Sequence, residues 1–292
     1  MQRIFGLVTI LLIVIAGCAQ QPGETGAGAT QATKTMQQLA DSTQEVYNLE
    51  TPLDPELVAG RNRFVFGLFD SANAFAANKE LKLFYGAGPE ETARGPVDVN
   101  FEEGVGDFPF YRAMIDFPSS GTWLILVVES DGASPRGAGV QIEVKRETSV
   151  PKVGDKAPAV PSPTVHDHQG VEDICTRDPE DPMHQISLDE ALGNGKSTVV
   201  VFATPALCTS RICGPVVDQV LTVRDKFEEE ANFIHVEVFA DRGGKEFAPA
   251  FAAWTLKTEP WTFVIDERGT IQARFEGPVS PGEIEAVLEE VL

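Results

Sequence analysis

Basic residues are scarce in this sequence. The 292 residues include 23 Lys or Arg against 44 Asp or Glu, which gives a formal net charge of −21. No cluster of Lys or Arg interrupts this acidity, and a surface rich in carboxylates repels a phosphate backbone. We therefore expect a protein that does not bind nucleic acid.

Long apolar runs are also missing after residue 18, where no stretch approaches the length of a membrane-spanning helix. Before it, Arg3 is followed by an apolar run over residues 4–16 that is typical of an export signal. The run ends in Ile15-Ala16-Gly17-Cys18, which resembles a lipobox and implies that Cys18 becomes a lipidated first residue. We expect an extracytoplasmic protein held at the cell membrane by acyl chains. An ordinary secretory signal or an uncleaved anchor are the alternatives.

Cysteine is rare, and its number is informative. With Cys18 lipidated, three of the 4 cysteines remain, namely Cys175, Cys208 and Cys213, in a compartment where disulfides persist. A single structural disulfide among these three cysteines would leave one thiol unpaired. Either a free thiol exists or a cysteine pair changes partners during a reaction.

Composition divides the chain into segments, and its length fits two folded domains after processing. The segments are a signal peptide (1–18), a flexible tether rich in Gln, Thr, Ala and Gly (19–48), a region of short β-type runs (49–148), a proline-rich linker (149–163) and a region that alternates strands with helices (164–292).

The region 49–148 contains six β-type runs separated by turn residues, which favours an immunoglobulin-like β-sandwich. In one run Val140, Ile142 and Val144 alternate with polar residues, as expected of a strand with one wet face. Phe64, Phe66, Phe69 and Trp123 are candidates for the core. No constellation of Cys or His occurs here, so we predict a spacer or docking module. The predicted runs are 61–69, 80–85, 97–101, 111–117, 122–129 and 139–146.

The region 164–292 predicts elements in the order β-α-β-α-β-β-α. Its first strand, over 197–203, is a continuous apolar run suited to a buried central strand, and helical spacing of apolar residues follows over 214–230. The remaining elements are a strand at 232–239, a helix at 246–255, a hairpin of 261–266 with 270–275, and a final amphipathic helix at 281–292.

Two cysteines lie where the predicted central strand gives way to the first long helix, in Phe202-Ala-Thr-Pro-Ala-Leu-Cys208-Thr-Ser-Arg-Ile-Cys213. A thiol there meets unpaired backbone N–H groups and the positive end of the helix dipole, which stabilise its thiolate. A neighbouring thiol can then attack a mixed disulfide and release the substrate. Over about 153–292 the chain resembles the thioredoxin superfamily. The resemblance implies that Cys208 attacks and Cys213 resolves.

The resemblance extends to Thr258-Glu259-Pro260-Trp261. In that family a cis-proline opens the strand opposite the active site and offers backbone to a substrate peptide, and Pro260 matches it. The match implies a cis bond between Glu259 and Pro260. It also implies a peptide-binding face that includes Trp261 and Glu259. Core packing is the alternative for Trp261.

Two features depart from the family pattern. Four residues separate Cys208 from Cys213 instead of two, so Cys208 is expected on the loop and Cys213 near the helix start. Val201 stands where thioredoxins carry a buried acid that assists proton transfer. We expect the Glu259 carboxylate to substitute for that acid. The alternative is that Glu259 is a solvated charge without a role in the reaction. Peroxidase chemistry is disfavoured, because Pro205 stands where peroxiredoxins have a threonine.

The role of Cys175 stays open between a buried thiol, a third redox partner and a metal ligand. His166, His168 and His184 flank it, but their spacing is not diagnostic of zinc or copper. We therefore predict no resident metal and no cofactor.

The function predicted from these residues is thiol–disulfide exchange with thiols and disulfides of other envelope proteins, through Cys208 and Cys213. A copper-binding metallochaperone is one alternative, since copper-delivery relatives of thioredoxin also widen the cysteine spacing. It needs a histidine, either His235 or one from 166–184. The other alternative is a redox-inert binding lipoprotein in which the two cysteines form a structural disulfide.

Overall fold

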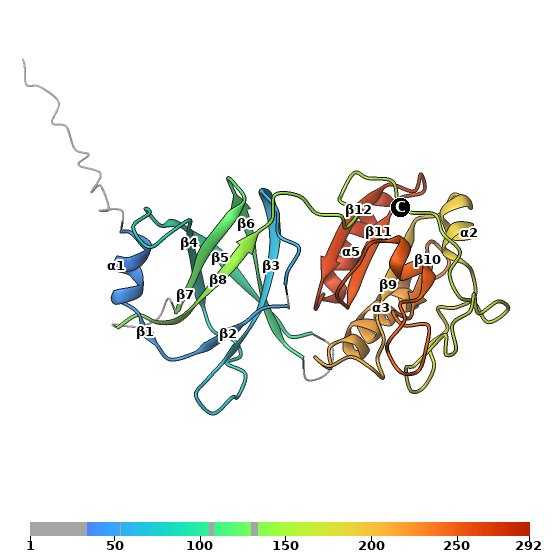
Figure 1. Cartoon of the computed structure of the whole chain (residues 1–292), viewed down its shortest axis with the longest axis horizontal. Helices are drawn as coiled ribbons and strands as arrows, with labels where there is room; N and C mark the ends of the chain where they lie inside the picture. Colours follow the sequence, from blue (N-terminus) through green and yellow to red (C-terminus); the bar gives the residue numbers. More distant parts are fainter. Residues whose placement is uncertain (1–33, 53, 105–107, 130–133) are drawn as a thin grey trace, which may run out of the picture. The chain divides into compact units, whose positions relative to one another are not determined.

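The structure is a computed structural model that describes residues 34–292, except for 53, 105–107 and 130–133. Lys34–Leu292 form one compact unit, in which an all-β region precedes an α/β region (Figure 1). The signal sequence and Cys18 lie outside the described residues. No helix in the described ranges combines the length and the apolarity that a bilayer span requires.

Eight strands of the all-β region form one hydrogen-bonded series in the order β1-β8-β7-β4-β5-β6-β3-β2. Strand β5 divides the series, because its first residues pair with β4 and its last with β6. Side chains from both halves share one core, which includes Phe64, Phe66 and Trp123 as predicted. The strands are β1 (Gln44–Glu45), β2 (Asn48–Glu50), β3 (Gly60–Phe69), β4 (Leu81–Gly86), β5 (Arg94–Glu102), β6 (Phe110–Phe117), β7 (Gly121–Glu129) and β8 (Arg136–Val144).

Residues 34–48 are folded, although the sequence predicts a tether as far as residue 48. Helix α1 (Met36–Asp41) begins with a capping box made by Thr35 and Gln38 and buries Met36. Strand β1 then pairs in parallel with β8, and the Tyr47 hydroxyl donates a hydrogen bond to Glu129 at 2.5 Å. Two buried side chains within so short a segment form no periodic pattern, which is why composition alone does not reveal this part of the fold.

The α/β region is built on a four-stranded sheet in the order β10-β9-β11-β12. The strands are β9 (Thr198–Phe202), β10 (Asn232–Val236), β11 (Trp261–Ile265) and β12 (Ile271–Glu276), and the helices are α2 (Leu188–Gly193), α3 (Cys213–Phe227), α4 (Pro249–Ala253) and α5 (Pro281–Val291). Strands β9 and β10 are parallel, whereas β11 is antiparallel to both β9 and β12. This is the arrangement expected of a thioredoxin-like domain.

Both faces of this sheet are covered, which explains the apolar run in its central strand. Val199 and Val201 of β9 pack in a cluster with residues of α3 and α5. Val200 and Phe202 point the other way and pack in a second cluster with α4. The proline-rich segment 149–163 contains no helix or strand, as predicted. Helix α4 is shorter than predicted, because Pro249 occupies its first turn.

Candidate redox site

The cysteine pair lies between the end of β9 and the start of α3. The loop after β9 turns back on itself, with the Cys208 N–H bonded to the Thr204 carbonyl at 3.0 Å. Cys213 is the first residue of α3. The structure joins Cys208 and Cys213 in a disulfide, with Cα atoms 6.0 Å apart. The pair therefore meets at the position predicted for it, with one cysteine on the loop and the other at the helix start.

The two sulfurs differ in their access to solvent. Cys208 is half-buried, and the next two residues of its loop are exposed. Cys213 is fully buried, at 0% exposure, among apolar side chains of α3 and β9. An incoming thiolate can reach the sulfur of Cys208 and not that of Cys213. This asymmetry is what an attacking and a resolving cysteine require.

Glu259 places a carboxylate next to this pair. One of its carboxylate oxygens and the sulfurs of Cys208 and Cys213 all lie within 4.8 Å of one another. Its Oε2 also accepts a hydrogen bond from the Thr204 N–H at 2.6 Å. Burial raises the pKa of Glu259 to about 7, an effect that the bond from Thr204 opposes and the nearby charge of Glu237 reinforces. Near neutral pH this carboxyl can both accept and release a proton.

The structure corrects the prediction for Trp261. This side chain is only 1% exposed and packs in the core. Its ring N–H donates to the Thr258 hydroxyl at 3.2 Å, and the Arg274 guanidinium lies over the ring, 5.7 Å from its centroid. Trp261 therefore cannot line a peptide-binding face, because the apolar strand β11 turns it inward. The Glu259–Pro260 bond is cis, as expected, and Pro260 is also buried.

A pocket of about 230 Å³ adjoins the cysteine loop. Thr204, Ala206 and Leu207 of that loop form one side of it, and Phe239 contributes an aromatic ring. Phe239 stacks on Phe247, which is 49% exposed. The remaining lining residues are Asp173, Thr176, Glu237, Asp241 and Arg242. The pocket offers an apolar contact and several charges beside the half-buried sulfur.

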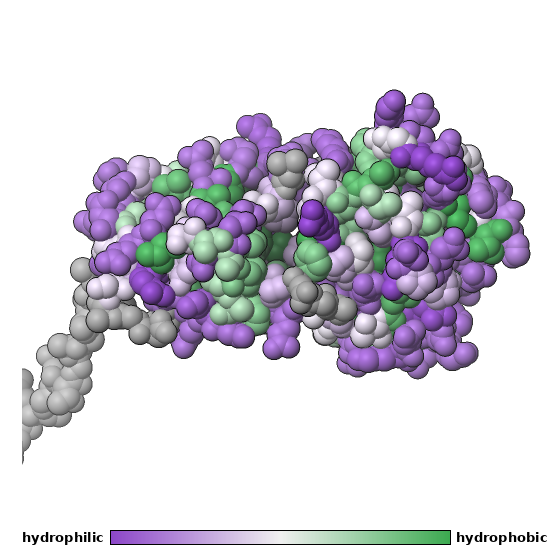
Figure 2. Space-filling model, turned by 90° about the horizontal axis from the view of Figure 1, so that it is seen from below, coloured by the Kyte–Doolittle hydropathy of each residue, from purple (hydrophilic) through white to green (hydrophobic). Residues whose placement is uncertain are grey.

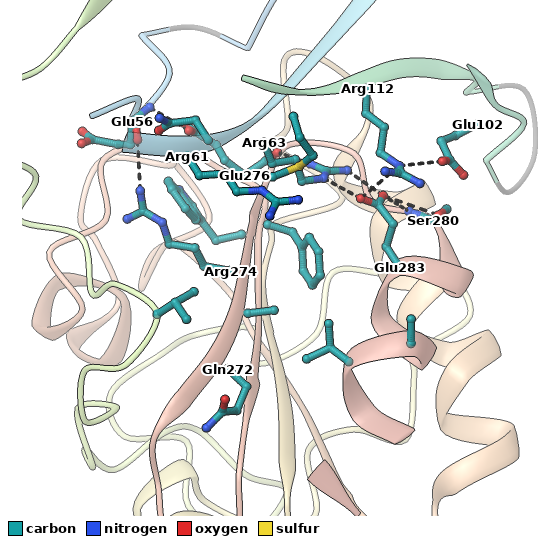
Figure 3. Close-up of a pocket in the computed structure, with 18 of the residues that line it drawn as sticks. Glu56, Arg61, Arg63, Glu102, Arg112, Gln272, Arg274, Glu276, Ser280 and Glu283 are labelled. Atoms are coloured by element: carbon teal, nitrogen blue, oxygen red, sulfur yellow. Dashed lines mark hydrogen bonds and ion pairs between the residues drawn. The ribbon is translucent and has the colours of Figure 1, made fainter. Parts of the chain in front are cut away.

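A larger pocket, of about 580 Å³, lies elsewhere, and neither Cys208 nor Cys213 lines it. It is lined by residues of β3, β6, β12 and α5, and Figure 3 shows their charged side chains turned toward one another. Arg63 bonds Glu283 at 2.7 Å, and Arg112 bonds Glu102 at 2.6 Å. Because these opposite charges compensate each other, size alone does not make this pocket the reactive site.

A second group of reactive side chains lies in the segment before β9 and on β10. One ligand atom from each of Cys175, Asp181, His184 and His235 lies within 4.8 Å of the other three. Burial lowers the pKa of His235, but its 2.8 Å bond to Asp181 outweighs this effect and raises the pKa to about 10. His235 therefore belongs to this group. In the described part of the chain, the third ligand-type neighbour of the disulfide is Glu259, not a histidine.

Sequence reasoning missed Asp181 and did not connect His235 with Cys175. The available signal was the position of His235, in the middle of the apolar run Phe233-Ile-His-Val, where a histidine needs a partner. The other signal was the spacing of Asp181 and His184, three residues apart. Neither shows which of the 4 histidines come together, because α2, β9 and α3 lie between His184 and β10 in the sequence.

No known family model matches the chain, and no curated protein matches it. Among solved structures, a thiol:disulfide interchange protein of the thioredoxin family from Chlorobium tepidum TLS is similar, with 16% identity, 46% of this chain and 99% of that chain covered, and a TM-score of 0.31. A thioredoxin-like protein in the oxidized form matches with 16% identity over 33% of this chain and 80% of its own, with a TM-score of 0.29. The Lin-41 filamin domain matches with 10% identity over 35% of this chain and 93% of its own, with a TM-score of 0.24. Similarities this weak say nothing about activity, so the function rests on the geometry of the site.

Proposed function

We propose that this protein exchanges thiols and disulfides with other proteins through Cys208 and Cys213. The observation that carries the proposal is the disulfide between a half-buried sulfur on the loop and a buried sulfur at the start of α3, with the Glu259 carboxylate beside both. A purely structural bridge needs neither the access to one sulfur nor the adjacent carboxyl.

The reaction follows from this arrangement. A thiolate of the partner attacks the sulfur of Cys208, a mixed disulfide forms, and the sulfur of Cys213 leaves as a thiolate. Protonated Glu259 gives its proton to that thiolate. A second thiolate of the partner then attacks the partner sulfur in the mixed disulfide and releases Cys208. The partner dithiol becomes a disulfide, the protein disulfide becomes a dithiol, and the same steps in reverse reduce a partner.

The setting of the reaction is part of the proposal. The signal-like residues 1–18 and the lipobox-like Cys18 support an extracytoplasmic protein anchored to the cell membrane by lipid. Its partners are then thiols and disulfides of envelope proteins near the membrane. The pocket beside Cys208 is where a segment of such a partner would lie.

The test uses the full-length protein with a fluorogenic disulfide and its single cysteine variants. Cys208→Ser is expected to abolish exchange. Cys213→Ser is expected to retain the first attack and to accumulate a mixed disulfide that mass spectrometry detects, because the resolving thiol beside Cys208 is missing. Cys175→Ser is the matched control and is expected to retain exchange.

The result also separates this function from a redox-inert bridge. A structural disulfide has a reduction potential below about −300 mV and resists a glutathione buffer. A Cys208–Cys213 pair that stays oxidised in such a buffer, together with full activity of Cys208→Ser toward the fluorogenic substrate, would overturn the proposal.

A further inference from the structure

We infer that Cys175, Asp181, His184 and His235 form a binding site for one divalent transition-metal ion, and that Zn²⁺ is the ion that fits it best. The site is separate from the disulfide and differs from the sequence-based expectation of no resident metal. It does not depend on the proposed exchange reaction. The observations that carry it are the convergence of the four side chains, an unpartnered buried histidine, and the loop contacts that hold the group together.

The four side chains have the donor set of a closed zinc site and lie close enough together for small shifts to bring them onto one ion. One ligand atom from each side chain lies within 4.8 Å of the other three. In a tetrahedral zinc site, sulfur, nitrogen and oxygen ligands lie about 2.0–2.3 Å from the ion, so the ligand atoms are roughly 3.3–3.8 Å from one another. Thiolate and carboxylate together balance two positive charges, while two imidazoles add none. A bound ion therefore leaves a neutral group in a buried place, which keeps the cost of desolvation low.

His184 is the side chain that protein contacts do not satisfy. It is 2% exposed, and within the described part of the chain neither of its ring nitrogens has a hydrogen-bond partner. An Asp181 oxygen lies 3.4 Å from Nε2, outside hydrogen-bond geometry. A buried imidazole left without partners is costly, and a metal ion at the centre of the group would supply the missing bond.

His235 presents one nitrogen to the group and has the other held by the backbone. Its Nε2 lies 2.9 Å from the Ala203 carbonyl, while Nδ1 lies 2.8 Å from Asp181. A carbonyl that accepts from one ring N–H directs the other nitrogen toward a metal, which is the usual outer contact of a histidine ligand. A metal ion at the site would displace the proton that Nδ1 now shares with Asp181.

The loop that carries the other three ligands is fixed to β10 on both sides of the group. The His235 N–H donates to the Met183 carbonyl at 3.0 Å, and the Met183 N–H donates to Asp181 at 3.0 Å. Next to Cys175, the Thr176 N–H donates to Glu237 at 2.6 Å. The contacts of the protein itself therefore position the ligands. Cys175 is only half-buried, so an ion has a path into the site.

The site would also support the redox loop. The Thr176 hydroxyl accepts a hydrogen bond from the Ala206 N–H at 3.1 Å, and Ala206 lies two residues before Cys208. Thr176 also lines the pocket beside that loop. An ion bound by Cys175 would thus fix one wall of the pocket through the residue that follows it.

The experiment measures Zn²⁺ and Co²⁺ binding to the full-length protein carrying Cys18→Ser, Cys208→Ser and Cys213→Ser, in which Cys175 is the sole thiol. We expect one ion per chain by competition with a chromogenic chelator. The Co²⁺ form should show the absorption bands of a tetrahedral ion and a thiolate-to-cobalt charge-transfer band. Because the redox pair is absent, this result stands whether or not the exchange reaction does.

Further substitutions in that background assign the ligands. Cys175→Ser and His184→Gln are each expected to weaken binding at least about tenfold, as loss of even an outer contact of a metal site does. The matched control is His166→Gln with His168→Gln, which removes the two exposed histidines and should leave binding unchanged. Circular dichroism checks that each variant is folded.

Three results would overturn the inference. They are no ion bound by the parent variant, a Co²⁺ form without a charge-transfer band from sulfur, and binding that survives both Cys175→Ser and His184→Gln. If a ligand variant fails to fold, the stoichiometry and spectrum of the parent variant decide the question alone.

Discussion

Glu259 is the residue on which proton movement at the disulfide depends. Thioredoxin-like domains place a buried acid at the position of Val201, which here is an apolar residue that is 0% exposed. Glu259 lies two residues before β11 and places a carboxylate oxygen within 4.8 Å of both sulfurs. Its position next to Pro260 means that the same segment supplies the acid and the turn opposite the cysteines.

Replacing Glu259 with Gln should change the pH profile of exchange. Burial raises the pKa of Glu259 to about 7, so the carboxylate that can deprotonate Cys213 becomes available as the pH rises through that value. We expect the rate at which reduced protein resolves a mixed disulfide to rise around pH 7 in the native protein. In Glu259→Gln this rise should be absent and the rate at pH 8 lower by about tenfold or more, since general-base assistance contributes on the order of 10²–10⁴. Stopped-flow measurement from pH 5 to 9 gives both quantities.

Glu276 supplies the control for that measurement. Burial also raises its pKa to about 7, but it accepts bonds from the Glu56 N–H and the Thr258 hydroxyl. Among the residues that the structure describes, it is in neither of the two groups that include a cysteine sulfur. Glu276→Gln should keep the native profile of exchange. An unchanged profile in Glu259→Gln would remove Glu259 from the reaction.

At the scale of elements, Glu129 at the end of β7 holds residues 34–48 to the sandwich. Its carboxylate bonds the Tyr47 hydroxyl at 2.5 Å and Arg136 at 2.7 Å, and it lies 3.2 Å from Lys79. The bond from Arg136 brings the pKa of Glu129 down to about 2, against the opposing effect of burial. The folded state therefore favours the ionised form of this side chain.

Glu129→Gln should destabilise the protein more at neutral pH than in acid. The folded-state pKa lies below the ordinary value of 4.5, so the stabilisation is present above pH 4.5 and is lost as the pH falls toward 2. Loss of a buried acceptor for charged groups should lower the free energy of unfolding at pH 7 by about 1–3 kcal/mol. Urea denaturation at pH 7 and pH 3 measures the difference, which should shrink at the lower pH. The exposed Glu143 on the neighbouring strand is the control, with an expected change within about 0.5 kcal/mol for Glu143→Gln.

Elements with a clear pattern of apolar residues were predictable from the sequence. Contacts between segments that lie far apart in the sequence were not. Strand β8 alternates apolar and polar residues, and β9 is a continuous apolar run, so each shows its burial in its own sequence. The disulfide followed from the place of Cys208 and Cys213 between β9 and α3. The sequence placed Trp261 on a peptide-binding face because the sequence of a strand does not show whether an aromatic residue lies on its buried or its exposed face. The grouping of Cys175 with His235 depends on how a loop without helix or strand packs on β10, which no local pattern encodes.

At the scale of the whole molecule, the excess of acidic residues should select partners by charge. The formal net charge is −21, and hydrophilic side chains cover much of the face shown in Figure 2. Near the cysteine loop the pocket includes Asp173, Glu237 and Asp241, while Arg242 is paired with Asp173 at 2.6 Å. A field of one sign raises the encounter rate of an oppositely charged reactant and lowers that of a like-charged one.

Reduced protein should therefore react faster with a cationic disulfide than with an anionic one, by a ratio that falls with salt. We expect the ratio of second-order rate constants for cystamine over oxidised glutathione to drop by about tenfold between low salt and 1 M salt, where the screening length shortens to about 3 Å. The rate constants are obtained by following the loss of free thiols in the Cys175→Ser variant, so that the signal comes from Cys208 and Cys213. Neutral hydroxyethyl disulfide should show no such salt dependence. A ratio that stays constant with salt would mean that contacts in the pocket, and not the charge of the molecule, decide which disulfide reacts.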